Sequence, residues 1–193
     1  GRNEDALVLY RDAYRLRKKV FTEKHPDTLQ SMANLSGALQ DVGKLDEALP
    51  LQERTLELHR DLLGENHPNT LICMNNTALL YADVDRLDDT IKLFEEVLQK
   101  MRTKLSDTHQ DTLIAMGNLA YFYNVVDRLD DAIKLGEERL AAEIGNRGED
   151  HIIVAACHSM LGTIYFTAED HAQAENHFSA SLAIREREDA SAW

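Results

Sequence analysis

The sequence predicts an all-α protein, an α-solenoid of antiparallel helix hairpins with about nine helices. Three observations support this fold class. The composition is helical, because only 3 of the 193 residues are proline and 9 are glycine. Histidines recur every 42 residues, at His25, His67, His109 and His151. Within each interval, apolar residues recur at every third or fourth position, the period of a helix that buries one face.

The repeat keeps one register along the whole chain, with no insertion or deletion. Residues 1–24 match the second half of a repeat, and four complete repeats follow at 25–66, 67–108, 109–150 and 151–193. We therefore expect one array over 1–193, and we expect it to be a piece of a longer protein because the register begins in mid-repeat. One hairpin cannot bury its own apolar face, so each repeat must stack on its neighbours.

Each complete repeat is predicted to contain two helices. In repeat 25–66 the first helix carries an apolar face at Leu29, Met32, Leu35 and Leu39. A second apolar stripe, between Leu45 and Leu63, indicates the second helix. The later repeats carry the same two stripes, and residues 1–24 supply one more second helix.

Short breaks separate the predicted helices. Gly43 and Lys44 form the turn inside the first complete repeat, and Gly64 is placed to end the second helix in a left-handed conformation. Pro68 fits the first turn of the next helix, where its missing N–H costs nothing. Small residues lie where two helices must approach closely, at Ser36, Ala78, Ala120 and Gly162.

Three segments set small residues between large ones: N-T-A-L-L-Y (Asn76 to Tyr81), N-L-A-Y-F-Y (Asn118 to Tyr123) and A-Q-A-E-N-H-F-S-A-S-L (Ala172 to Leu182). They resemble the tetratricopeptide repeat, or TPR, whose usual unit has 34 residues. The 42-residue unit, with L-G-x-x-H-P-x-T-L between repeats (Leu63 to Leu71), is similar to the kinesin light chain type. Similar arrays also occur beside NTPase and protein-kinase domains of signalling proteins. The resemblance implies a right-handed superhelix whose concave surface binds proteins.

The sequence departs from the TPR pattern on the second helix. Gln52 and Gly136 stand where the pattern has an aromatic residue, and Thr55, Val97 and Arg139 occupy a position that is normally small. We expect looser or different packing at these places.

The decapeptide VDRLDDTIKL begins at Val84 and returns as VDRLDDAIKL at Val126, which raises the question of a metal site or an acid pair. In the repeat frame, Asp85 lies in the turn between the two helices, and Asp88 and Asp89 open the second helix. Aspartate there can accept from free backbone N–H groups and favours the positive end of the helix dipole. The alternating ligands and glycine of a calcium loop are absent from the sequence. We therefore interpret these aspartates as structural.

No motif predicts catalysis, a metal or a cofactor. The in-phase histidines lie on stacked repeats about 10 Å apart, too far to share one metal ion, and we expect them to cap helices or pack against the next hairpin. Cys73 and Cys157 lie two repeats apart, roughly 20 Å, which excludes a disulfide between them. The sequence contains no glycine-rich phosphate loop and no H-E-x-x-H motif. We therefore predict that the protein is not an enzyme.

Three asparagines recur in phase in the middle of the first helices, at Asn34, Asn76 and Asn118, where asparagine is a poor helix former. A helical wheel puts them away from the buried stripe, on the arc that lines the concave surface in TPR arrays. The resemblance implies that this amide ladder binds the backbone of an extended peptide, since one amide both donates and accepts. The alternative is a helix–helix hydrogen bond that fixes repeat geometry. The ladder ends at Met160.

Six further residues of this arc complete the candidate peptide-binding surface: Asn75, Leu79, Asp83, Tyr121, Asn124 and Phe166. The arc holds no Lys or Arg, which a groove for an acidic peptide normally needs. We therefore expect a protein or peptide ligand that is neutral or basic and has apolar anchors, unless second-helix residues supply positive charge. Asp83 would add about 1 kcal/mol or less toward a basic residue if exposed.

The net charge of −13 disfavours nucleic acid and anionic membrane surfaces as partners. No apolar run is long enough to span a membrane, and no signal peptide is visible. Because the two cysteines form no disulfide framework, a reducing, cytoplasmic location is the simpler interpretation. The alternative function is an oligomerisation or regulatory arm, since the half-repeat at 1–24 leaves an apolar face that favours self-association through repeat ends.

Overall fold

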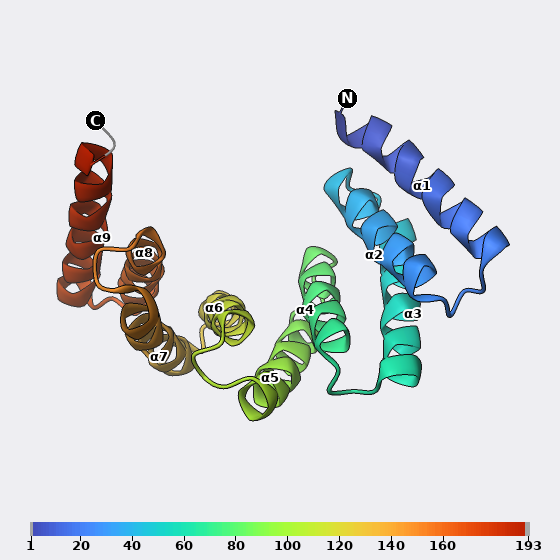
Figure 1. The fold of residues 1–193 in the computed structure, drawn as a ribbon. Helices are drawn as coiled ribbons and strands as arrows, with labels where there is room; N and C mark the ends of the chain where they lie inside the picture. Colours follow the sequence, from blue (N-terminus) through green and yellow to red (C-terminus); the bar gives the residue numbers. More distant parts are fainter. Residues whose placement is uncertain (1, 192–193) are drawn as a thin grey trace. The chain divides into compact units, whose positions relative to one another are not determined.

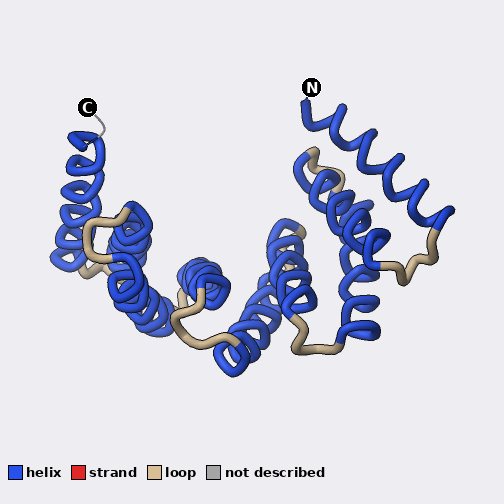
Figure 2. Tube along the Cα trace, viewed as in Figure 1, coloured by secondary structure: helices blue, strands red, loops and turns tan. Residues whose placement is uncertain are grey.

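The computed structural model describes residues 2–191, with side chains over 3–188. Within these residues it contains nine α-helices and no strand, which confirms the predicted all-α class (Figures 1 and 2). Helices α2, α4, α6 and α8 are the first helices of the four complete repeats, and the others are second helices. The helices are α1 (Arg2–Val20), α2 (Pro26–Asp41), α3 (Leu45–Leu63), α4 (Pro68–Asp83), α5 (Leu87–Lys104), α6 (Gln110–Val125), α7 (Leu129–Arg147), α8 (Ile152–Thr167) and α9 (His171–Ser191).

The chain divides into two compact lobes, an N-terminal lobe of Gly1–Leu93 and a C-terminal lobe of Phe94–Trp193, and α5 contributes to both. In the N-terminal lobe α1 packs on α2, α2 on α3 and α3 on α4. In the C-terminal lobe α6 packs on α7, α7 on α8 and α8 on α9, and α6 also contacts α8. These contacts join helices that are next, or next but one, along the chain, which is the pattern of stacked repeats.

The apolar face predicted for the first complete repeat forms the core of the N-terminal lobe. Leu29 and Met32 of α2 pack with Leu58 of α3, and none of the three exposes more than 3 % of its surface. The close helix approach predicted at Ser36 is present, because its hydroxyl donates to the carbonyl of Ala48 over 3.1 Å. Burial of such side chains stabilises the fold by about 1.5–3 kcal/mol each.

Two glycines shape the packing of the C-terminal lobe. A Cβ on Gly136 would lie 2.7 Å from the side chain of Leu161, so the missing side chain makes room for this fully buried leucine of α8. A Cβ on Gly162 would meet the Phe178 ring of α9 at 2.7 Å, so this glycine admits the ring. The departure from the TPR pattern at position 136 therefore gives different packing, as expected, with the neighbouring leucine in the space.

The turn between the two helices of a repeat contains one residue in the left-handed region. These residues are Gly43, Asp85, Asp127 and Glu169, with φ between 59° and 73°. After α4, the N–H of Asp85 donates to the carbonyl of Ala82 over 3.0 Å and that of Arg86 to the carbonyl of Tyr81 over 2.8 Å. This bond pair is the Schellman pattern, which satisfies the last carbonyls of the helix. Aspartate tolerates the left-handed conformation better than most residues, so the predicted turn position is confirmed.

The arginine of the repeated decapeptide joins neighbouring helices. Arg86 donates to Asp89 over 2.8 Å and to Glu53 of α3 over 3.2 Å, and its guanidinium lies 4.1 Å from the ring centre of Tyr81. The Tyr81 hydroxyl donates to the same Glu53 over 3.0 Å. In the C-terminal lobe the same cluster recurs with Arg128, Asp131, Glu95 and Tyr123.

The aspartates at the starts of α5 and α7 take the predicted place at the positive end of the helix dipole, but Asp131 does not show the predicted bond to the backbone. The residue before α7, Arg128, makes no side-chain capping bond. Asp131, in the first turn of α7, accepts from the Arg128 side chain instead of a backbone N–H. The negative charge still lies at the helix start, where it interacts favourably with the dipole.

Each in-phase histidine caps the helix that follows it. The Nδ1 atoms of His25, His67 and His109 accept from the backbone N–H two residues later over 3.2 Å, and that of His151 does so over 3.1 Å. All four residues have extended backbone geometry, as N-cap residues require. This confirms the capping expectation and accounts for the 42-residue spacing of the histidines.

The prediction for Gly64 was wrong in its conformation. Gly64 follows α3 directly, but with φ 87° and ψ 163° it lies in an extended region with positive φ, and not in the left-handed helical region. Gly148 has almost the same angles after α7. The chain needs this conformation to pass from one repeat to the N-cap histidine of the next, and glycine adopts it without a side-chain clash.

Candidate functional site

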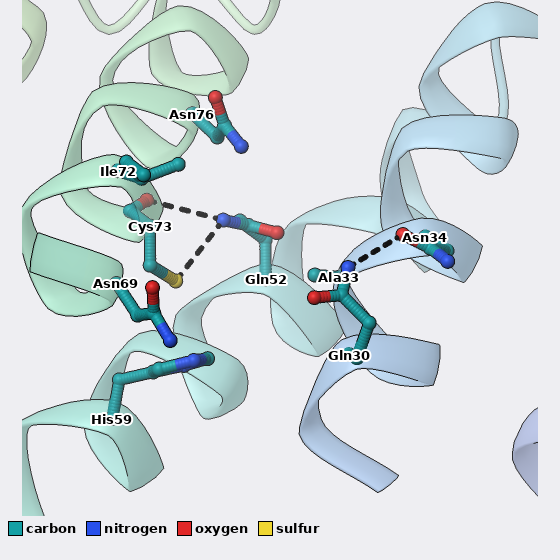
Figure 3. A pocket seen from close by; sticks show the side chains of 9 residues that line it. All are labelled: Gln30, Ala33, Asn34, Gln52, His59, Asn69, Ile72, Cys73 and Asn76. Atoms are coloured by element: carbon teal, nitrogen blue, oxygen red, sulfur yellow. Dashed lines mark hydrogen bonds between the residues drawn. The ribbon is translucent and has the colours of Figure 1, made fainter. Parts of the chain in front are cut away.

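A cavity of about 200 Å³ opens in the N-terminal lobe between the first helices of two successive repeats. Gln30, Ala33 and Asn34 of α2 form one wall, and Asn69, Ile72, Cys73 and Asn76 of α4 form the other. Gln52 and His59 of α3 lie between the walls (Figure 3). We call this the amide cavity, because four of its nine lining residues carry amides in addition to Gln52.

Two predicted site residues, Asn34 and Asn76, lie on opposite walls of the amide cavity (Figure 3). Asn34 is exposed, and its Oδ1 accepts from the side-chain amide of Gln30, one turn earlier on the same helix, over 2.9 Å. Asn76 is also exposed, and its side chain makes no hydrogen bond with any residue in the described part of the chain. Neither of these two amides bonds to a neighbouring helix in the described part of the chain, so the helix–helix bond of the alternative interpretation is not present at Asn34 or Asn76.

The floor of the cavity comes from the second helix α3, and Gln52 is its centre. Its side chain exposes only 3 %, and its Nε2 donates to the carbonyl of Cys73 and to the Thr77 hydroxyl, each over 3.2 Å. The glutamine that replaces the expected aromatic residue thus ties α3 to α4. Because a primary amide has two donors and one acceptor oxygen, the Nε2 bonds leave Oε1 to face the space between the walls (Figure 3).

His59 supplies a second polar group at the floor. One of its ring nitrogens, Nδ1, lies 2.9 Å from the carbonyl oxygen of Thr55. A carbonyl only accepts, so Nδ1 donates, and in the neutral ring Nε2 is left as an acceptor. His59 and Asn69 were not among the predicted site residues. His59 lies on the second helix, and the phase of that helix relative to the first is the signal that could have identified it.

Cys73 is an inert part of the wall. Burial raises the pKa of its thiol to about 12, so the group stays protonated and uncharged at neutral pH. Both cysteines of the chain, Cys73 and Cys157, are buried free thiols.

Three other predicted site residues lie near the amide cavity. Leu79 and Asn76 line a smaller adjoining cavity of about 70 Å³. Asn75 is half-buried. Asp83 is exposed and accepts from the Gln40 side chain over 2.6 Å, so part of its hydrogen-bonding capacity is already used within the lobe.

The remaining predicted site residues belong to the C-terminal lobe and do not line the amide cavity. Tyr121 and Phe166 are exposed by 56 % and 61 %, unusual values for aromatic side chains on packed helices. Asn118 is half-buried on α6, and the Oδ1 of Asn124 is buried without a hydrogen-bond partner in the described structure.

Within the described residues, no group of three or more His, Cys, Asp or Glu side chains is arranged to hold a metal ion. In the same part of the chain, none of the helices has the length and apolarity needed to cross a membrane.

Comparison with known proteins places these features in a family. A family model described as tetratricopeptide repeat matches residues 33–103 and 111–187, and a second model with the same description matches residues 1–27. No curated protein sequence matches the chain.

Solved structures share the fold at low sequence identity. The nearly identical TPR-like repeats of a putative kinesin light chain from Podosopora anserina have a TM-score of 0.86 and 22 % identity over 97 % of this chain and 89 % of that one. BtubC (BKLC) from P. vanneervenii has a TM-score of 0.85 and 20 % identity over 98 % of this chain and 75 % of that one. MamA from Desulfovibrio magneticus has a TM-score of 0.65 and 15 % identity over 96 % and 98 %. At these identities the likeness is one of fold.

Proposed function

The chain belongs to the tetratricopeptide repeat family, with a fold like that of kinesin-light-chain-like repeats, and from this premise we propose that its first-helix surface binds an extended segment of a partner protein. Membership of this family supports a role in protein–protein interaction, and proteins of this fold are generally scaffolds and not enzymes. The 42-residue register continues through α5, so we treat 1–193 as one array of repeats. A cytoplasmic location fits the two buried free thiols.

The observation that carries the proposal is the pair of exposed amides on opposite walls of the amide cavity. Asn76 has its full hydrogen-bonding capacity available, and Asn34 keeps its donors. A peptide backbone presents one donor and one acceptor per residue, which an asparagine amide can match without reading the sequence. The acceptor atoms at the floor, Gln52 Oε1 and His59 Nε2, would receive a donor from a ligand side chain.

The chemistry of the N-terminal cavity favours a neutral or basic segment. No lysine or arginine lines the amide cavity, so it offers no charge-assisted donor to a carboxylate. Asp83 lies on the same surface and adds negative charge, although its bond to Gln40 reduces its availability. The apolar anchors of such a ligand would rest on Ile72, which is 46 % exposed, and on Leu79.

The test is binding of a selected peptide to paired variants. A library of extended peptides would be selected on the wild-type protein, and the best binder would then be titrated against the double variant Asn34→Ala and Asn76→Ala. Because each lost hydrogen bond contributes about 0.5–1.5 kcal/mol, we expect binding to weaken about tenfold. The melting temperature should change by less than about 2 °C, since both side chains are exposed.

Asn66→Ala is the matched control, because Asn66 is an exposed asparagine in the turn before α4 and outside the cavity. Its binding should equal that of the wild type. Unchanged peptide binding by the double variant, together with a large fall in its melting temperature, would support the repeat-fixing role of the asparagines and contradict the proposal.

A second candidate function is self-association through α1, in which the occupant of the exposed face is a second copy of the chain. Leu16 is 55 % exposed, whereas its equivalent one repeat later, Leu58, is fully buried against α2. Leu9 is 70 % exposed, whereas its equivalent Leu135 exposes 7 %. The apolar face of α1 thus has the composition of a face that elsewhere in the array packs against a first helix.

A further inference from the structure

The residues of the C-terminal lobe that correspond in the repeat to those at and beside the amide cavity have different chemistry. A shift of two 42-residue repeats carries Ala33 to Gly117, Thr55 to Arg139, His59 to Glu143 and Asn76 to Met160. The amide wall and the neutral floor are therefore replaced by a thioether, an arginine and a glutamate. Arg139 is one of the three residues that stand at a normally small position of the TPR pattern, where looser or different packing was predicted.

The Arg139 side chain reaches from α7 across the face of α6 toward α8. A Cβ on Gly117 of α6 would lie 2.5 Å from Nη1 and 2.8 Å from Cζ of Arg139. The guanidinium therefore lies directly on the bare backbone of Gly117, which the glycine alone permits. On the other side, Nη1 lies 3.9 Å from the sulfur of Met160, the residue that replaces the asparagine of the ladder.

This guanidinium has no acidic partner in the described part of the chain. Its Nε is buried without a hydrogen-bond partner, and its one polar contact is the weak acceptor sulfur of Met160. Three other arginines of the lobe pair with carboxylates: Arg128 with Asp131 and Glu95, Arg102 with Glu138, and Arg147 with Glu143. A partly buried charge without a partner is costly, so an anion that reaches this group would gain affinity from it.

Glu143 does not neutralise Arg139, although it lies one turn further along the same helix. It is fully buried, and its Oε2 accepts from Arg147 over 2.8 Å. Its Oε1 is buried without a partner in the described structure. Since the Glu143 charge is matched by Arg147, the three groups leave one surplus positive charge, at Arg139.

We propose that Arg139 binds a carboxylate of a partner polypeptide, held against the Gly117 backbone between α6 and α8. The inference rests on the proposed function and adds to it, because it names a partner group for the C-terminal lobe. The expectation of a neutral or basic ligand then applies only to the amide cavity of the N-terminal lobe. In the C-terminal lobe, Arg139 of the second helix α7 supplies the positive charge that the first helices lack on this surface. A single guanidinium pairs with one carboxylate in a bidentate arrangement.

The test uses the whole chain and three capped tripeptide probes. Acetyl-Ala-Glu-Ala-amide carries a side-chain carboxylate, acetyl-Ala-Gln-Ala-amide is its neutral isostere, and acetyl-Ala-Ala-Ala with a free carboxyl end carries a terminal carboxylate. Titrations at low salt would follow the Nε–Hε resonance of Arg139 and the amide resonance of Gly117 by NMR. We expect the glutamate probe to shift both resonances and to bind about tenfold more tightly than the glutamine probe, which corresponds to about 1.4 kcal/mol. The relative affinity of the third probe decides between side-chain and terminal carboxylates.

Three variants test whether the preference for the glutamate probe depends on the charge of the Arg139 side chain or on a general change in the structure. Arg139→Gln should remove the preference for the glutamate probe, and Arg139→Lys should keep only part of it, because lysine lacks the fork. Arg15→Gln makes the same change in net charge at a residue whose side chain is 77 % exposed in α1, and it should leave the preference intact.

Two results would overturn the inference. One is equal binding of the glutamate and glutamine probes by the wild type. The other is a preference that persists in Arg139→Gln. Because both readouts are local to the C-terminal lobe, they are independent of the asparagine variants. Failure of the amide-cavity proposal alone would leave the Arg139 resonance responding as described.

Discussion

At the scale of single residues, two facing histidines in the C-terminal lobe make the stability of the folded protein depend on pH. The Nδ1 atoms of His158 on α8 and His177 on α9 lie 2.9 Å apart, so one donates and the other accepts. The His177 ring also stacks on Tyr165, with the ring centres 5.3 Å apart. Burial lowers the pKa of both histidines, and the charge of His177 lowers that of His158 further. Glu137 faces His177 and opposes this effect, because its charge raises the His177 pKa.

The folded protein should therefore lose stability as the pH falls from 7.5 to 5.5. A histidine whose pKa is depressed in the folded state is neutral there, while the unfolded chain takes up protons near its ordinary value of about 6.5. The contribution is present above about pH 6.5 and is lost as the pH falls through the folded values. It is at most about 1 kcal/mol, because both rings are partly exposed to solvent.

Thermal unfolding at the two pH values, compared with the variant His177→Phe, measures this contribution. Phenylalanine keeps the ring stack on Tyr165 but cannot titrate, so the fall in melting temperature between pH 7.5 and 5.5 should be smaller in the variant. Equal falls in the two proteins would show that the pair does not sense pH.

At the scale of elements, the three turns between complete repeats carry different residues at the position that has positive φ. Gly64 and Gly148 have φ of 87° and 86° at this turn, and the residue in the equivalent place after α5 is Ser106, with φ 123°. Positive φ is strained for a residue with a Cβ and costs about 1–3 kcal/mol. The turn after α5 therefore holds a conformation that its own residue disfavours.

Replacing Ser106 by glycine should stabilise the protein. Relief of the strain is partly offset by the extra freedom of glycine in the unfolded chain, about 0.5–1 kcal/mol, so we expect a net gain of about 1 kcal/mol. The reverse change, Gly148→Ser, places a serine in the same kind of turn and should destabilise by a similar amount. Denaturant titrations of both variants measure this, and a Ser106→Gly variant less stable than the wild type would contradict the explanation.

The helices and the binding residues were predictable from the sequence to different degrees. Repetition fixed the helices, because Leu29 and Met32 recur with the period of a buried helical face. The repeat pattern could not predict the backbone conformation of Gly64, because glycine can adopt several φ/ψ regions with positive φ. Which of them it adopts depends on the direction in which the chain must continue to the next helix. The wall residue Asn76 followed from the phase of a single helix. Arg139 did not, because its relevance depends on a bare glycine in another helix and on the absence of an acidic neighbour in space.

At the scale of the whole molecule, the sequence repeat produces similar side-chain contacts between successive pairs of helices. The Tyr–Glu–Arg–Asp cluster around Arg86 recurs around Arg128 with nearly equal distances, so two of the complete repeats share this contact with the helix before them. Specific binding must then come from places where repeats differ. The amide cavity and the surroundings of Arg139 are two such places, one neutral and one cationic, in a chain of net charge −13.

Because repeats pack on one another through equivalent faces, the exposed apolar face of α1 predicts that the chain binds a second copy of itself. Leu9 and Leu16 of α1 are equivalent to the buried residues Leu135 and Leu58, and burying them would contribute about 1.5–3 kcal/mol each. We therefore expect the average mass from static light scattering to rise with protein concentration over the micromolar to millimolar range. The double variant Leu9→Gln and Leu16→Gln should stay monomeric over that range. Leu182→Gln is the control, because it removes an equally exposed leucine, at 57 %, from α9 at the other end of the array, and it should associate like the wild type. A wild-type protein that stays monomeric throughout would mean that the exposed face of α1 does not bind another copy of the chain.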